Sequence, residues 1–249
     1  MIYFLSDVHL GLSLPERSSL DRERLVVEWL DGIEDRCSEL FIVGDFFDFW
    51  FEYQRVVPSG FVRVLGRLAR LRDRGIPIHF FAGNHDMWLR GYLSSEIGCT
   101  VYTSPSVFER YGRRILVAHG DGLSSRDTAG RVLSAVFHSR VIRWLFRWMV
   151  HPDLALRFGH WWSRGNRTRR PGISHEFRGV DEPLVRWAIG RREADSSLDS
   201  FVFGHLHTPQ YVEIGGGGVV LILGEWIENP TVASLDERGF RLEKVEISQ

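Results

Sequence analysis

The sequence contains only two cysteines, Cys37 and Cys99, and no CxxC spacing. That is too little for a disulfide framework or a zinc site held by thiolates, and it is typical of a protein from a reducing compartment. No apolar run approaches the length that spans a bilayer, and Asp7 comes too early for a signal peptide. We therefore expect a cytoplasmic protein, attached at most as a peripheral protein to the cytoplasmic face of the inner membrane.

The sequence also lacks an overall excess of charge, and it has a single lysine, Lys244. At a net charge of −1, no global field attracts nucleic acids, which argues against them as partners. The arginines are unevenly spread, because ten of them, against two aspartates, lie between Arg126 and Arg170. This aromatic-rich stretch has a net charge of +8, and the remainder has −9. No segment indicates an obligate protein partner.

The length and composition suffice for one large domain of the α/β or α+β class. The chain has 249 residues, of which 44% are hydrophobic, and these can bury a sizeable core. The patterns predict buried strands at residues 2–5, 40–43, 76–81, 115–118 and 201–203, and amphipathic helices at 21–34 and 61–74. Alternating strands and helices favour an α/β architecture. We expect a single domain over residues 1–249, with a helical cap inserted at about 128–172 and a glycine turn at 215–218.

The inserted segment contains a stretch, residues 131–150, whose pattern predicts an amphipathic helix. Arg140, Arg143 and Arg147 fall on one face, and mostly apolar side chains fall on the other. The apolar face could simply pack on the main domain. Tryptophan, phenylalanine and arginine together also suit an anionic membrane surface or the acyl chains of a lipid. We expect the cap to pack in part and to bind lipid as well.

Polar side chains suited to metal binding follow five predicted strands at the point where each strand ends. They are Asp7 and His9; Asp45; Asn84, His85 and Asp86; His119 and Asp121; and His205 and His207. The carboxyl ends of strands in open α/β sheets gather ligands in one place, so these side chains can converge. A lone Asp or His after a strand is usually structural, but the same kind of side chain after each of five predicted strands predicts a metal site. Carboxylate, imidazole and amide ligands suit Mn²⁺, Fe²⁺ or Zn²⁺, and a shared carboxylate can join two such ions.

In this order, the motifs D-x-H, G-D, G-N-H-D, H-G-D and G-H-x-H resemble those of the calcineurin-like metallophosphoesterases. The resemblance implies a β-sandwich flanked by helices and two divalent metal ions, Mn²⁺ foremost, with Fe²⁺ and Zn²⁺ as alternatives. Carried over by position, it implies one ion on Asp7, His9, Asp45 and His207, and the other on Asp45, Asn84, His119 and His205. It also implies a catalytic His85 beside the leaving group, oriented by Asp86.

A narrower resemblance rests on G-D-F-F-D-F-W-F-E-Y at 44–53, H-G-D-G-L at 119–123 and L-G-E-W at 223–226, together with the arginine- and tryptophan-rich cap. These features resemble the UDP-2,3-diacylglucosamine pyrophosphatases of lipid A synthesis, in the branch with His rather than Arg in G-N-x-D. The family's cap uses a lysine near the substrate, and here an arginine would serve, since it binds diphosphates well. The resemblance implies substrate contacts from Asn84, Asp127, Ser163, Arg167, Arg170 and His205.

The predicted reaction is metal-dependent hydrolysis of the diphosphate bond of UDP-2,3-diacylglucosamine, a nucleotide-sugar lipid, to UMP and the lipid sugar 1-phosphate. Three alternatives stay open. The same chemistry could act on a phosphomonoester, a cyclic nucleotide or another phosphodiester. A nuclease could contact phosphates through the basic cap and stack bases on its aromatic rings. A binding or scaffolding protein could keep the fold without the activity, although the complete ligand set argues against that alternative.

Overall fold

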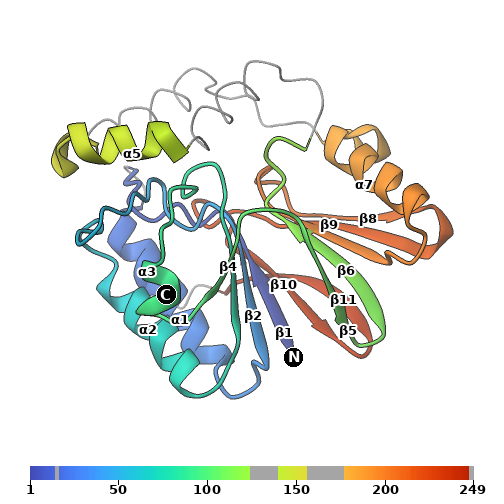
Figure 1. The fold of residues 1–249 in the computed structure, drawn as a ribbon. Coiled ribbons are helices and arrows are strands. Elements are labelled where there is room, and N and C mark those ends of the chain that lie inside the picture. Colours follow the sequence, from blue (N-terminus) through green and yellow to red (C-terminus); the bar gives the residue numbers. More distant parts are fainter. Residues whose placement is uncertain (15–16, 124–139, 156–176, 247–249) are drawn as a thin grey trace.

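Two β-sheets packed face to face, with helices on both outer faces, form the body of the protein (Figure 1). The structure is a computed structural model, and it describes residues 1–14, 17–123, 140–155 and 177–246. The predicted α/β architecture with a β-sandwich is confirmed.

The first sheet has six strands in the order β11-β10-β1-β2-β3-β4. Their bounds are Ile2–Leu5 for β1, Glu39–Val43 for β2, Ile78–Phe81 for β3, Thr100–Tyr102 for β4, Thr231–Asp236 for β10 and Gly239–Lys244 for β11. Strands β1 to β4 run parallel, and β10 pairs antiparallel with both β1 and β11. The first three predicted strands are therefore neighbours in one sheet, and the third begins at Ile78 rather than at residue 76.

The second sheet has five strands in the order β5-β6-β7-β9-β8. Their bounds are Ser106–Arg110 for β5, Arg113–Ala118 for β6, Ser200–Phe203 for β7, Gln210–Ile214 for β8 and Gly218–Ile222 for β9. Strands β6, β7 and β9 run parallel, and the edge strands β5 and β8 are antiparallel to their neighbours. The 3₁₀ turn η2 (Gly215–Gly217) joins β8 to β9, as the glycine run predicts.

The alternation of side chains along each strand divides the apolar residues between two cores. In β1, Ile2 and Phe4 point into the core between the sheets, while Tyr3 and Leu5 join the core beneath the helices on the outer face. Both faces of β1 are buried, so its sequence is continuously apolar, as expected of a central parallel strand. Burying one such side chain contributes about 1.5–3 kcal/mol.

The helices cover the outer faces of the two sheets. Helices α1 (Ser19–Ile33) and α2 (Val62–Asp73) pack on the first sheet, and α7 (Pro183–Ala194) packs on the second. Helix α1 begins where Ser18 caps it by accepting a hydrogen bond from the Asp21 N–H at 3.1 Å. The shorter elements are α3 (Tyr92–Ser95), α5 (Arg140–Met149) and the 3₁₀ turn η1 (Gly179–Asp181). Among the helices of the described residues, none is long and apolar enough to cross a membrane.

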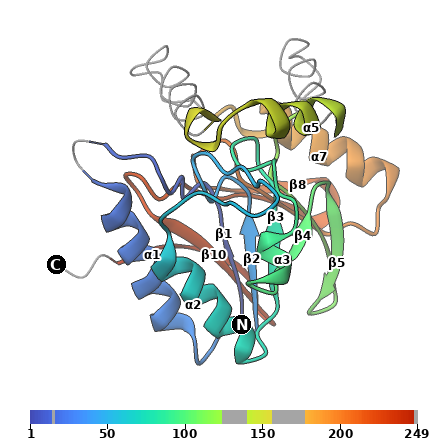
Figure 2. The ribbon, with the colours of Figure 1, turned by 60° about the vertical axis from the view of Figure 1, so that its left-hand side comes forward.

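The parallel strands of both sheets end at the same edge of the sandwich. The loops that follow β1, β2 and β3 therefore meet the loops that follow β6 and β7. Figures 1 and 2 show α5 lying across this end of the molecule. The fold thus gathers the predicted metal-binding segments from both sheets at the end of the molecule where α5 lies.

Candidate metal centre

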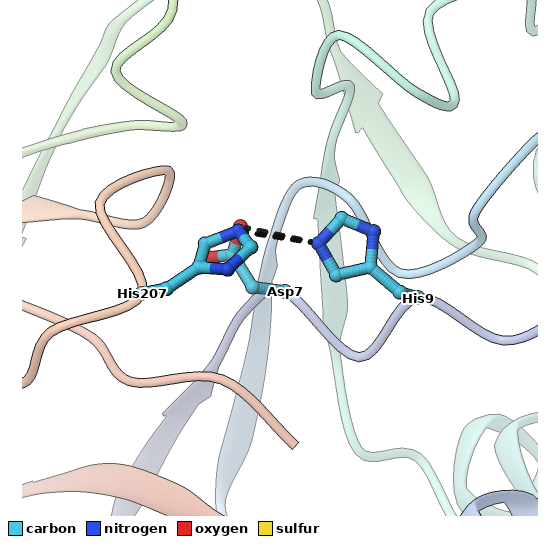
Figure 3. Close-up of side chains that lie close together, drawn as sticks. All are labelled: Asp7, His9 and His207. Carbon is cyan, nitrogen blue, oxygen red and sulfur yellow. Dashed lines mark hydrogen bonds and ion pairs between the residues drawn. The ribbon is translucent and has the colours of Figure 1, made fainter. Parts of the chain in front are cut away.

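Three of the predicted ligands form one tight group at the ends of β1 and β7 (Figure 3). His207 Nε2 lies 3.1 Å from Asp7 Oδ1 and 3.3 Å from His9 Nε2. His9 Nε2 in turn lies 3.8 Å from Asp7 Oδ1. One carboxylate oxygen and two imidazole nitrogens therefore face a common point, although nearly 200 residues separate them in the chain.

A second group forms around Asp45, at the end of β2. Its Oδ2 lies 3.3 Å from His119 Nε2 and 3.9 Å from His85 Nε2, and Asn84 Oδ1 lies 3.3 Å from the same His119 nitrogen. The His205 ring packs edge-on against His119, with ring centroids 5.2 Å apart. Ligand-type atoms of Asp45 lie within 4.8 Å of those of both Asp7 and His9. Asp45 thus lies between the two groups, where a bridging carboxylate is expected.

The buried polar atoms fit a cation better than they fit one another. Asp7 Oδ2 accepts hydrogen bonds from Ser6 Oγ and the His205 N–H, whereas the buried Asp7 Oδ1 faces the Nε2 atoms of His207 and His9. His119 Nδ1 lies 2.9 Å from the Val43 carbonyl oxygen and must donate to it. This bond leaves the Nε2 lone pair of His119 directed at Asp45 and Asn84. A backbone partner on the far nitrogen is what fixes a metal-ligating histidine.

The electrostatics of the site favour ionised carboxylates. Burial tends to raise the pKa of Asp45, but the nearby His119 and His85 outweigh it and hold that pKa well below its usual value. Burial also tends to raise the pKa of Asp7, but the nearby His207 outweighs it, so this pKa is lowered as well. Burial lowers the pKa of His205, and His119 adds to the effect, which favours the neutral imidazole that binds metals. A bound divalent cation would neutralise the negative charge of these carboxylates, as a proton does in other buried carboxyl groups.

The backbone at the strand ends adopts a left-handed conformation that few residue types accept. Among the described residues, seven that are not glycine have positive φ, and five of them are predicted metal ligands. These five are Asp7 (53°), His9 (50°), Asp45 (49°), His205 (70°) and His207 (59°). Asp and His tolerate this region better than most residues do. Strained backbone of this kind clusters at functional sites, where it directs side chains.

Two motif glycines have no room for a side chain because ligand groups lie directly on them. A Cβ at Gly83 would lie 2.5 Å from the Asp45 nitrogen and 2.9 Å from Asp45 Cγ. A Cβ at Gly204 would lie 2.7 Å from Asp7 Oδ2. The glycines of G-N-H-D and G-H-x-H are therefore required because a ligand residue of a neighbouring loop, Asp45 or Asp7, occupies the space of their missing side chains.

His85 has a different partner from the one that the sequence predicts. The predicted orienter, Asp86, is fully buried, and its carboxylate accepts backbone hydrogen bonds from Phe46, Phe47 and Gly83 at 2.8, 3.3 and 2.7 Å. It ties the loops after β2 and β3 together. Burial and the charge of Asp45 raise the pKa of Asp86 to about 7. His85 Nδ1 instead lies 2.8 Å from the Asp48 carbonyl, to which it must donate. The structure thus gives His85 a backbone partner, and the orienting role of Asp86 stays a prediction.

Two residues that contact the site histidines, Asp48 and Arg22, are not identified by the sequence motifs. Asp48 is buried, and its Oδ1 lies 3.7 Å from His9 Nδ1 and 3.9 Å from His85 Nδ1. It therefore lies on the Nδ1 side of two site histidines, where a carboxylate often orients a histidine that binds metal through its other nitrogen. Arg22 of α1 is also fully buried and donates to the His9 carbonyl at 2.8 Å. The spacing of Asp48, three residues after Asp45, is a usable signal, but nothing in the sequence near Arg22 identifies its contact.

The described part of the cap, residues 140–155, contains helix α5, which lies within the helix predicted at 131–150. Phe146 packs on Phe51 and Trp88, with ring centroids 5.2 and 5.0 Å away. Trp144 and Trp148 stack on each other and are 61% and 79% exposed. One apolar side of α5 therefore covers loops of the main body, and another faces outward. Four predicted substrate contacts lie outside the described residues: Asp127, Ser163, Arg167 and Arg170.

Residues 1–209 match the family model of the calcineurin-like phosphoesterases. The chain belongs to this family. A protein named UDP-2,3-diacylglucosamine hydrolase from Porphyromonas gingivalis is 35% identical, over 98% of this chain and 97% of that protein. One of the same name from Pseudomonas putida F1 is 29% identical over the full length of both. A solved dimetal phosphatase from Danio rerio aligns over 99% of this chain and 98% of its own, with a TM-score of 0.48 and 16% identity.

Membership confirms the predicted family and the hydrolase class. Calcineurin-like phosphoesterases use divalent metals, and the groups around Asp7 and Asp45 are candidate sites for them. The motifs therefore lead to the same family as the comparison of whole sequences.

Proposed function

We propose that this protein hydrolyses the diphosphate bond of UDP-2,3-diacylglucosamine, giving UMP and the acylated sugar 1-phosphate. The observation that carries the proposal is that the exposed aromatic helix α5 packs on the loops after β2 and β3, the same loops that supply Asp45 and His85 to the cluster of carboxylates and imidazoles. A substrate with two acyl chains and a diphosphate needs both surfaces. The name and full-length similarity of the Porphyromonas gingivalis relative support the same substrate.

The proposed centre holds two divalent ions, Mn²⁺ foremost as the family resemblance implies, with Fe²⁺ and Zn²⁺ as alternatives that the same oxygen and imidazole ligands suit. The first ion is assigned to Asp7, His9, Asp45 and His207, and the second to Asp45, Asn84, His119 and His205. When bound, such ions activate water and neutralise charge on the phosphoryl oxygens. Asp45, which lies between the groups, keeps them together. Asn84 and His205 are also assigned to the substrate, whose phosphoryl oxygens would lie beside them.

His85 is proposed to bind or protonate the oxygen of the leaving group. Its Nδ1–H is committed to the Asp48 carbonyl, so Nε2 is the nitrogen available to the reaction. Nε2 lies 3.9 Å from Asp45 Oδ2, at the border of the centre. A positioned acid of this kind contributes about 10²- to 10⁴-fold to the rate.

The cap is proposed to supply the lipid specificity. Trp144 and Trp148 offer an outward apolar surface on α5, where acyl chains or the interfacial region of a membrane would lie. The charged part of the substrate is assigned to cap residues beyond α5, namely Asp127, Ser163, Arg167 and Arg170. This assignment also places the enzyme at the cytoplasmic face of the inner membrane as a peripheral protein.

Incubation with Mn²⁺ and two substrates tests the activity. UDP-2,3-diacylglucosamine should yield UMP, and UDP-glucose, which lacks acyl chains, should yield far less. Asp45→Asn serves as the inactive control. Equal cleavage of both substrates would contradict the lipid specificity. Cleavage of neither, with turnover of a phosphomonoester or of DNA, would replace the proposed function by that activity.

Liposome binding tests the role of α5 separately. The protein should sediment with anionic vesicles at low salt and less at high salt, because the attraction is screened. Trp148→Ser should weaken this binding several-fold. Val62→Ser, which removes a similarly exposed side chain (75% against 79%) from α2, is the matched control and should not change it. Equal binding by both variants and the parent protein would contradict the membrane role of this helix.

A further inference from the structure

A cavity of about 130 Å³ opens beside the metal centre, and none of the roles above uses it. Its walls come from the end of β3, the loop between β4 and β5, and the end of β6. His119 and Gly83 line both this cavity and the centre, so a group held in the cavity would lie next to whatever the centre holds. Such a position suits the part of a substrate next to the reacting phosphate.

The polar side of the cavity is formed by Asp121 and the Ser104 hydroxyl. Asp121 is half-buried, and its carboxylate has no hydrogen-bond or ion-pair partner among the described residues. It is close enough to His119 and His205 to interact with both imidazoles electrostatically. A carboxylate with both oxygens available can accept hydrogen bonds from two adjacent hydroxyl groups. The vicinal 2′- and 3′-hydroxyls of a ribose have this arrangement.

The other side of the cavity is apolar. Met87 and Leu123, both partly buried, contribute to the lining. A thioether and a branched aliphatic side chain are good neighbours for a flat aromatic ring. The volume is well below the roughly 300–1,000 Å³ of pockets for whole drug-sized ligands, and it suits one or two small rings.

Helix α5 and the cavity share the segment that follows β3 but extend from it to different neighbours. Phe146 of α5 contacts Trp88 in that segment and Phe51 in the segment after β2, whereas the cavity is completed by the loop after β4 and the end of β6. Figure 1 shows α5 and the upper end of β6 as separate borders of this end of the molecule. A substrate with acyl chains at one end and a nucleoside at the other would therefore extend across the centre from α5 to the cavity.

We infer that this cavity binds the nucleoside of the substrate, with the ribose hydroxyls on Asp121 and the base between Met87 and Leu123. The inference rests on the proposed function for the identity of the nucleoside, uridine. It assigns the two products to different sides of the centre: UMP to the cavity and the acylated sugar phosphate to the α5 side.

The test measures binding by calorimetry to the Mn²⁺-loaded protein. UMP should bind at least about 10-fold more tightly than methyl phosphate, which has the phosphate and no nucleoside. The 2′,3′-dideoxy analogue of UMP should lose most of that advantage, because Asp121 then has no hydroxyl to accept from. Ser104→Trp, which fills the cavity from an exposed loop, should bring the ratio of the two affinities close to one.

The matched control is Ser95→Trp, which fills a separate groove near α3 lined by Glu52 and Tyr53 and should leave the ratio unchanged. Glucose 1-phosphate is the third ligand. If Ser104→Trp weakens glucose 1-phosphate binding and spares that of UMP, the cavity takes the sugar and the inference is overturned. It is also overturned if UMP binds no more tightly than methyl phosphate. Failure to hydrolyse UDP-2,3-diacylglucosamine would refute the proposed function alone, since these binding ratios do not depend on it.

Discussion

The substitution Gly83→Ala should disable the metal centre through a residue that has no side chain of its own. The new Cβ would lie 2.9 Å from Asp45 Cγ and 2.5 Å from the Asp45 nitrogen. Carbon atoms in contact are about 3.5–4.0 Å apart. The Asp45 carboxyl group must therefore move by at least about 0.6 Å. Overpacking of this kind costs about 1–3 kcal/mol in stability, and a displacement of about 1 Å at a reacting centre can reduce the rate 10²-fold.

The assays are metal content, turnover of an aryl phosphoester and the melting temperature. Gly83→Ala should lose bound Mn²⁺ and at least about 10²-fold in kcat, while circular dichroism still shows the native fold. Gly66→Ala is the control, because a Cβ there meets nothing within 4 Å and alanine favours the helix. It should keep full activity and metal content. Near-normal turnover with two bound ions in Gly83→Ala would refute the reasoning about Asp45.

Three further predictions concern single side chains. Asp45→Asn should lose more activity and more metal than Asp7→Asn, because Asp45 lies in both ligand groups; measured metal stoichiometry decides this. His85→Ala should lower kcat by about 10² to 10⁴ and leave the metal content near normal, and loss of metal would mean that His85 is a ligand. Burial tends to raise the pKa of Glu39, but hydrogen bonds from Arg110 and a neighbouring imidazole outweigh it and lower the pKa to about 2. Since the folded pKa lies below the unfolded one, Glu39 stabilises the fold above about pH 4.5, by up to about 3 kcal/mol, and loses this effect as the pH falls towards 2. Urea unfolding should therefore show that Glu39→Gln is destabilising at pH 6 and less than half as destabilising at pH 3, since the effect vanishes only below the folded pKa of about 2.

The sheet and the positions of the predicted ligands could be anticipated because both follow from short-range rules. Continuous apolar runs such as residues 2–5 and 201–203 are buried on both faces, which is the pattern of central parallel strands. The carboxyl ends of parallel strands share an edge within each sheet, and the packing of the two sheets brings these two edges together. His207 and Asp7 then meet at 3.1 Å although the sequence gives no direct sign of their contact.

The contacts behind the ligands could not be anticipated, because they depend on the paths of the loops. Asp86 follows His85 directly, which suggests an orienting pair. The backbone instead directs the Asp86 carboxylate into the interior, where three N–H groups from two loops surround it. Asp48 takes the place beside His85 because the loop after β2 folds back along the loop after β3, with the Trp50 N–H donating to the His85 carbonyl at 3.2 Å. Adjacency in the sequence says little about such cross-loop pairing.

The left-handed strand ends connect the fold to the chemistry. A side chain on a strand alternates between the two faces, so an ordinary continuation of β1 would place Asp7 and His9 in line with one face of the sheet. Positive φ at both residues turns the chain and directs the two side chains into one space. The same turn occurs at Asp45, His205 and His207, in both sheets. Backbone of this kind costs free energy that packing elsewhere must offset. Because a cation between the two sheets would bind only this arrangement, ion binding and the strained backbone stabilise each other, and the centre can be both exact in geometry and built from loops.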